Sequence, residues 1–195
     1  MDYAGLGTVV YPQVAGLKSR VQNRINTQLR RRICLLLRRQ GQGQPNICLW
    51  GSNETQLNNN GVLSLTEDVY SYRQNAAHGL TMRTAATFDV VTGQVCGLSE
   101  LFKTGADYIT PISQEIRRQI DEQDIPLLRE FTHIGPNQEY FLTETNLVIY
   151  FQTYDYTPYY VGIPKFPIAI ESLRDLIDTR SLLHRLLPAK PLYLD

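Results

Sequence analysis

The chain has 195 residues, of which 43% are hydrophobic, and this length is sufficient for a single domain with one sizeable core. No stretch approaches the roughly 20 consecutive apolar residues that cross a bilayer, so the composition excludes a membrane-spanning helix. The net charge is zero, and the three cysteines form no CxxC pair, so neither a zinc ribbon nor a disulfide framework is predicted.

The charges are distributed unevenly along the chain. Residues 1–53 carry eight basic side chains and one acidic side chain, whereas the rest of the chain carries eleven basic and eighteen acidic ones. A basic helix in the first part can meet nucleic acid, an anionic membrane or an anionic wall polymer. The alternative is a solvated helix face that pairs with acidic surface elsewhere in the same domain. Charge asymmetry alone is weak evidence of a ligand, so we favour the second interpretation and expect no nucleic-acid partner.

The first residues contain no visible secretion signal. Met1 is followed by DYAGLGTVVYPQV, which has neither a basic n-region nor an apolar h-region. A chain that begins natively at Met1 is therefore expected to be cytoplasmic.

The first half of the chain predicts a long helix and three strands. Residues 7–14 are expected to form an edge strand, because the segment contains a proline that cannot donate to a sheet. Between Leu17 and Gln40, apolar residues recur at three- and four-residue spacing with arginines on the opposite side, which predicts an amphipathic helix. Strands at 47–57 and 62–73 flank an Asn-Gly turn typical of a β-hairpin, and a third strand is expected at 80–91.

The strand at 62–73 alternates in polarity. Leu63 and Leu65 fall on one face, whereas Ser64 and Thr66 fall on the other. We therefore expect one face of this strand to pack, while the opposite face is largely polar.

The second half of the chain predicts a helix, a second hairpin and short terminal elements. Isoleucines at helical spacing indicate the helix, and two runs rich in β-branched and aromatic residues indicate the hairpin. The expected elements are a helix at 107–123, strands at 140–142, 147–152 and 166–170, a helix at 172–178, and a tail at 188–195.

These elements define the expected fold. All the strands are joined by hairpins or by helices, so the sheet should be mostly antiparallel. The sequence predicts an α+β fold in which a long N-terminal helix and further helices pack on one face of a mostly antiparallel β-sheet. No linker or repeat divides residues 1–195, which are expected to form a single domain.

The residues contain no recognisable catalytic motif. His78, His133 and His184 stand alone in sequence, and no nucleophile elbow or phosphate-binding loop occurs. Three carboxylates flank the aromatic segment and resemble a glycosidase acid pair in type, but carboxylates beside turns usually cap the backbone or face solvent. We therefore predict a non-enzymatic protein without a metal or cofactor site, and keep as an alternative a hydrolase whose residues converge only in the fold. The three carboxylates are Glu139, Glu144 and Asp155.

Tyrosine is concentrated in the second hairpin and the connection that follows it, which hold six of the twelve tyrosines. Tyr154, Tyr156, Tyr159 and Tyr160 surround Pro158 just after a strand. Tyrosine costs little entropy to immobilise and offers an apolar face with a polar tip, so a stiffened exposed loop of this kind suits recognition of a protein or a glycan. The alternative is a packed crossover whose rings fill the core, and alternation predicts that about half of the rings are buried.

Two segments resemble a known family. The order YFLT-x3-LVIYFQ-x-Y-x-x-TPYYVGIPKFPI, from Tyr140 to Ile168, is similar to the C-terminal domain of the RsiV-type anti-sigma factors. The same family resembles a domain attached to the peptidoglycan deacetylase PdaC. A second segment, AAHGLTMRTAATFDVVTGQVCGLSELF from Ala76 to Phe102, resembles the family's His-Gly turn, strand and Leu-x-x-Leu-Phe helix start. The two segments occur in family order, and the resemblance extends over residues 47–178.

The resemblance implies an extracytoplasmic, non-enzymatic sensing or binding domain, because such domains are best known for binding lysozyme. We expect a Tyr/Pro-rich surface that meets a protein ligand such as a lysozyme-like cell-wall enzyme. A module that binds cell-wall glycan (peptidoglycan) is the alternative, suggested by the aromatic faces and by the deacetylase. His78 can instead tie down its own loop by a hydrogen bond. The expected ligand-binding residues are Tyr154, Tyr156, Pro158, Tyr159, Tyr160 and His78.

Overall fold

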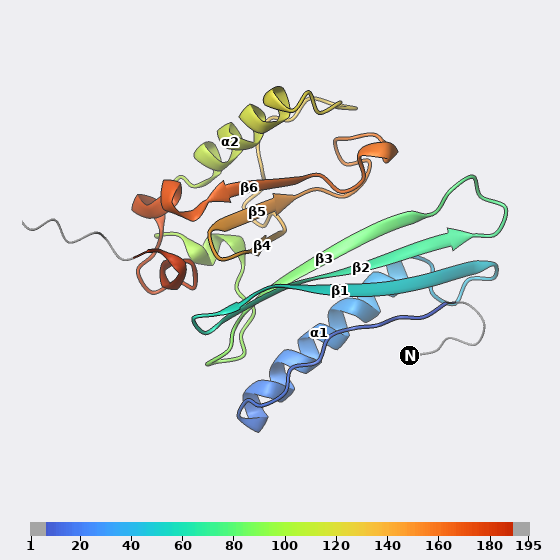
Figure 1. Ribbon diagram of the computed structural model, residues 1–195, viewed down its shortest axis with the longest axis horizontal. Helices are drawn as coiled ribbons and strands as arrows, with labels where there is room; N and C mark the ends of the chain where they lie inside the picture. Colours follow the sequence, from blue (N-terminus) through green and yellow to red (C-terminus); the bar gives the residue numbers. More distant parts are fainter. Residues whose placement is uncertain (1–6, 189–195) are drawn as a thin grey trace, which may run out of the picture.

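The computed structural model describes residues 7–188, which form two three-stranded antiparallel sheets and two α-helices (Figure 1). The strand orders are β1-β2-β3 in the first sheet and β4-β5-β6 in the second. Short 3₁₀ segments complete the chain. The elements are α1 (Ser19–Arg39), β1 (Ile47–Asn59), β2 (Val62–Arg73), β3 (Leu80–Asp89), α2 (Ile109–Glu122), β4 (Tyr140–Leu142), β5 (Asn146–Tyr150) and β6 (Lys165–Ala169).

The first sheet is built on the predicted Asn-Gly hairpin. Asn60 and Gly61 have φ values of 50° and 74°, and Asn59 pairs with Val62 across the turn. Two successive positive φ values define the turn whose twist matches that of the flanking strands, so the local sequence fixes this connection. The register shifts between Thr55 and Leu57, where β1 carries a bulge.

Helix α1 packs on one face of the first sheet. Its last residue is followed by Gln40, whose Nε2 donates to the carbonyls of Val69 at 2.7 Å and Leu80 at 2.9 Å. These bonds fasten the C-terminal end of α1 to two strands. The buried residues of the helix, which meet Leu63, Leu65, Val69 and Phe88 of the sheet, are Ile25, Leu29, Ile33, Leu36 and Leu37.

The second sheet covers part of the opposite, polar face of the first sheet. Ser64 is fully buried there, and its Oγ lies 2.8 Å from Oγ1 of Thr87. The backbone N–H of Leu142, in β4, donates to Ser64 Oγ at 2.9 Å. Ala85 meets Phe141 of the second sheet beside this network. The polar face of β2 is thus buried where hydrogen bonds from the second sheet satisfy it.

Helix α2 covers the outer face of the second sheet. Its residues Ile112 and Ile116 are fully buried in the largest apolar cluster. Gln119 Nε2 donates to the carbonyl of Pro167 at 2.7 Å. Pro167 lies in β6, an edge strand of this sheet, where the missing N–H costs no sheet hydrogen bond.

The layers therefore run α1, first sheet, second sheet, α2 (Figure 1). The structure confirms the predicted α+β fold, the antiparallel pairing and the long N-terminal helix. It differs in that the strands are divided between two sheets, and each sheet carries its own α-helix on its outer face. A periodic pattern shows that a helix has one apolar face, but not which sheet that face meets.

Smaller differences concern the two ends of the chain. Residues 7–14 form only a single parallel bridge, between Val9 and Gly51, where a predicted edge strand was expected. The helix expected at 172–178 is a 3₁₀ helix at Ile170–Leu176. Residues 189–195 of the expected tail lie outside the described chain. Neither α-helix in the described chain combines the length and the apolarity that a membrane crossing requires.

Glu67 interrupts the apolar face beneath α1. It lies on β2 between Leu65 and Val69, and its exposed fraction is 1%. Its two carboxylate oxygens have no hydrogen-bond partner among the residues that the structure describes. Burial raises the pKa of Glu67 to about 7, although the nearby Arg32 guanidinium opposes this shift. The carboxyl group is therefore a pH-sensitive weakness in the α1 interface.

We expect the free energy of unfolding to fall as the pH rises from about 4.5 to about 7, since the folded chain holds the Glu67 proton more tightly than the unfolded chain. The contribution of Glu67 to this loss is about 3 kcal/mol. Glu67→Gln should remove it and flatten the pH profile. Urea unfolding of both proteins at pH 5 and pH 8 measures the difference.

The exposed Glu144 provides the control, because Glu144→Gln should leave the profile unchanged. Parallel pH profiles for wild type and Glu67→Gln would show that this carboxyl group is not responsible.

Candidate functional site

The two sheets differ in strand length, and this leaves an open cleft at one end. Strands of the first sheet have 10 to 13 residues, whereas those of the second have three to five. The long connection between β5 and β6 extends beyond the second sheet at this end (Figure 1). Between this connection and the first sheet lies a cleft of about 440 Å³. It is lined by Asp68, Thr81 and Arg83 of the first sheet and by Thr153, Tyr159, Tyr160, Gly162, Ile163 and Lys165.

Aromatic rings from distant parts of the chain meet beside the cleft. The imidazole of His78, in the β2–β3 connection, stacks on the Tyr159 ring with centroids 3.9 Å apart and an interplanar angle of 25°. Tyr154 stacks on Tyr159 at 6.1 Å. Tyr160 follows in sequence and is the most exposed of these rings, with an exposed fraction of 78%. We call His78, Tyr154, Tyr159 and Tyr160 the ring cluster.

The β2–β3 connection holds His78 in place. Nδ1 of His78 lies 3.0 Å from the carbonyl of Gly79, so it donates this hydrogen bond when it carries the proton. A side chain at position 79 would collide with the Tyr70 ring and the Ser71 carbonyl, so only glycine permits this close approach. The predicted local hydrogen bond of His78 is therefore present together with its ring contact.

The β5–β6 connection is fastened by its own backbone. The N–H of Gln152 donates to Asp155 Oδ2 at 3.0 Å, and the N–H of Tyr154 donates to the carbonyl of Thr157 at 3.2 Å. Tyr154 has a φ of 72°, an uncommon conformation for a non-glycine residue that the surrounding turn maintains. A 3₁₀ turn at Tyr159–Val161 follows Pro158. The rings are thus presented by a fixed loop.

Gln152 joins this loop to the edge of the first sheet. Its Oε1 accepts from the Arg83 backbone N–H at 3.0 Å, and its Nε2 donates to the Arg83 carbonyl at 2.7 Å. The side-chain amide therefore takes the place of a neighbouring strand at this point of β3. The Arg83 guanidinium forms two bonds of 2.7 Å with the Asp68 carboxylate, and this paired charge lies in the wall of the cleft.

Tyr156 faces the opposite way. Its ring packs edge-on against Phe131 at 5.4 Å and Phe151 at 4.8 Å, and the Arg129 guanidinium lies 4.5 Å from its centroid. Pro158 is half-buried. Of the six residues predicted to bind a ligand, four form the ring cluster, while Tyr156 and Pro158 support the loop from below.

Sequence reasoning missed the aromatic pair of Trp50 and Tyr70. These residues are cross-strand partners in the first sheet, their centroids are 5.8 Å apart, and both are exposed. Tyr70 also lies against Gly79, next to His78. The Asn-Gly turn alone would not pair Trp50 with Tyr70, because the bulge between Thr55 and Leu57 shifts the register.

No group of three or more His, Cys, Asp or Glu side chains within residues 7–188 is arranged to hold a metal ion. Cys34, Cys48 and Cys96 are all unpaired.

Comparisons with known proteins support the fold and part of the resemblance. The model of a family described as a protein of unknown function (DUF3298) matches residues 99–171. A solved structure of a DUF3298 family protein from Pseudomonas aeruginosa is similar, with a TM-score of 0.63 and 15% identity over 89% of this chain and 85% of that one. A DUF3298 family member from Bacteroides fragilis gives a TM-score of 0.59 and 15% identity over 86% of this chain and 69% of that one. No curated protein matches the sequence.

We expect Tyr156 and Tyr160 to differ sharply in their effect on stability. Tyr156→Ala removes a ring packed between two phenylalanines and should lower the free energy of unfolding by about 2–3 kcal/mol. Tyr160→Ala removes an exposed ring and should change it by less than about 0.5 kcal/mol. Urea unfolding of the two variants tests this, and equal losses would contradict the assigned orientations.

Proposed function

We propose that this chain is a non-enzymatic binding or sensing domain of RsiV type, which presents the ring cluster to a protein ligand such as a lysozyme-like cell-wall enzyme. The observation that carries the proposal is the rigid display of exposed rings. Three of the predicted tyrosines are exposed at the open end of the sheets, on a loop held by its own hydrogen bonds. Because the loop is ordered in advance, little entropy is lost when a partner immobilises its rings.

The shape of the ring cluster favours a protein over a sugar. A sugar stacks on a free ring face, but one face of the Tyr159 ring is covered by the His78 imidazole. Tyr160 projects outward, as an anchor that enters a pocket on a partner does. The likeness of residues 99–171 to DUF3298 agrees with the RsiV resemblance only at the level of a domain of unknown function. An extracytoplasmic location is part of the proposal and rests on that resemblance.

A module for cell-wall glycan is the second candidate, and the cleft beside the ring cluster favours it. Its walls carry the hydroxyl of Thr81, the paired charges of Asp68 and Arg83, and the amine of Lys165. Such groups hydrogen-bond sugar hydroxyls, and Tyr160 offers an accessible ring at the rim. The two candidates share residues, so the test must compare both ligands.

We expect the double variant Tyr159→Ala/Tyr160→Ala to bind lysozyme at least about 30-fold more weakly than wild type, because two anchor rings are removed. Calorimetric titration with lysozyme and, separately, with soluble peptidoglycan fragments measures the effect. The melting temperature should change little, because both rings are exposed. The exposed Val91 supplies the control, since Val91→Ala removes apolar surface outside the ring cluster.

The outcomes separate the candidates. Binding of the glycan fragments alone, with a loss in the ring variant, favours the glycan module. Unchanged lysozyme binding in the ring variant would contradict the proposed surface, and so would a loss of equal size in Val91→Ala.

A further inference from the structure

The arginines of α1 have no acidic partners within the described chain. The helix carries seven arginines and no acidic residue. None of the ion pairs within residues 7–188 involves α1. The favoured sequence interpretation, in which this basic face pairs with acidic surface of the same domain, is therefore wrong for the described residues. A helix that concentrates like charges without neutralising them requires another explanation.

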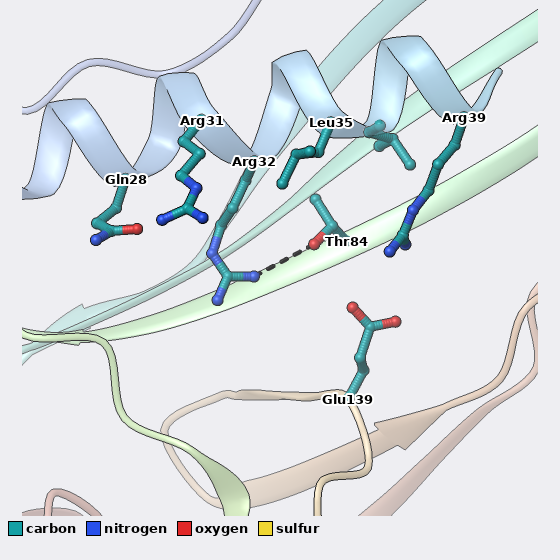
Figure 2. A pocket seen from close by; sticks show the side chains of 8 residues that line it. Gln28, Arg31, Arg32, Leu35, Arg39, Thr84 and Glu139 are labelled. Atoms are coloured by element: carbon teal, nitrogen blue, oxygen red, sulfur yellow. Dashed lines mark hydrogen bonds between the residues drawn. The ribbon is translucent and has the colours of Figure 1, made fainter. Parts of the chain in front are cut away.

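One side of α1 forms the wall of a pocket of about 310 Å³. Figure 2 shows Arg31, Arg32 and Arg39 extending from the helix in the same direction, toward β3 and toward Glu139 before β4. This pocket lies apart from the ring cluster and shares no lining residue with the cleft beside it. It is lined by Gln28, Arg31, Arg32, Leu35, Leu36, Arg39, Thr84 and Glu139.

The three arginines are not equivalent. Arg32 is fixed, because its Nη1 donates to the Ala85 carbonyl at 2.8 Å and approaches Thr84 Oγ1 at 3.4 Å. Arg31 and Arg39 are exposed, and neither forms a hydrogen bond or an ion pair with another described residue. Two guanidinium groups with all their donors available thus flank one that is already held in place.

Glu139 is the one carboxylate in this lining, and it does not neutralise the arginines. It forms no ion pair with them, and Gln152 Nε2 donates to its Oε2 at 3.3 Å. Burial raises the pKa of Glu139, against the opposing charges of Arg32 and Arg39. The pocket therefore keeps an excess of positive charge.

We infer that this pocket binds a small ligand that carries at least two oxyanion groups, phosphate or carboxylate. The planar fork of arginine matches the oxygens of both groups. Arg31 and Arg39 are eight residues apart, which corresponds to about 12 Å along a helix, so two separate anionic groups are accommodated. Leu35 lies between them and offers an apolar contact to the middle of the ligand.

A neighbouring pocket supports an extended ligand. It measures about 210 Å³, continues along the edge of β3, and shares Arg32 and Glu139 with the first pocket. The first pocket has no aromatic lining residue on which a base could stack, so nucleic acid is the less suitable ligand. The site is independent of the proposed function of the ring cluster.

The test compares two double variants of the full chain. Arg31→Ala/Arg39→Ala removes the two unpaired arginines of the pocket. Arg30→Ala/Arg38→Ala removes two exposed arginines with the same spacing on the same helix that do not line it. Both variants lose the same charge, so only the pocket distinguishes them. Calorimetric titrations with tripolyphosphate and with citrate, at physiological ionic strength, provide the readout.

We expect the first double variant to bind the preferred probe at least about 30-fold more weakly than wild type and the second to stay within about threefold, because exposed charges outside the pocket are screened. Glu139→Gln should tighten binding several-fold, since it removes the one negative charge from the lining. Binding of tripolyphosphate alone identifies a phosphate ligand, and binding of citrate alone identifies a carboxylate ligand.

Equal losses in both double variants would overturn the inference, because they would indicate attraction to the helix as a whole. Absence of binding by wild type to both probes would overturn it as well. Melting temperatures of the two double variants, which should agree, exclude a difference in folding.

Discussion

The unequal length of the two sheets is the constraint on which the rest of the structure depends. The short second sheet covers only part of the polar face of the first, where Ser64 and Thr87 bond to each other and Ser64 accepts from the Leu142 N–H. Beyond that contact the first sheet continues without a covering strand. The remaining surface becomes the wall of the cleft, and the loop that closes the second sheet becomes its opposite wall. The position of the ring cluster is therefore a consequence of strand length.

Gln152 converts this loose end into a defined one. A connection of this length would be mobile if it were held only at its two ends. The Gln152 amide instead pairs with both backbone groups of Arg83, and Asp155 and Thr157 close the turn beyond it. Tyr156 then packs into the core while its neighbours remain outside. The same segment therefore contains both the support and the exposed surface, which is why rings adjacent in sequence have different roles.

Local patterns in the sequence were sufficient for much of the fold. The Asn60-Gly61 turn, the periodicity of both α-helices and the strand composition around Leu147 each determine structure through neighbouring residues. Contacts between distant segments were not predictable, because alternation shows that the Ser64 face is polar without showing what covers it. The ring loop was found by composition, whereas its contact with His78 was suggested only by the family resemblance. Glu67 gave no local signal, since its burial depends on α1.

The short second sheet has a consequence for how the molecule opens. Strands of three to five residues do not form a stable sheet by themselves, so β4–β6 stay ordered through their contacts with the first sheet and α2. Separation of the two sheets would be a cooperative local unfolding event, and the cleft contains residues from both sides of that division. A molecule gripping both sides would thus act as a staple. Amide exchange would then slow across the whole of β4–β6, including positions that the bound molecule never touches.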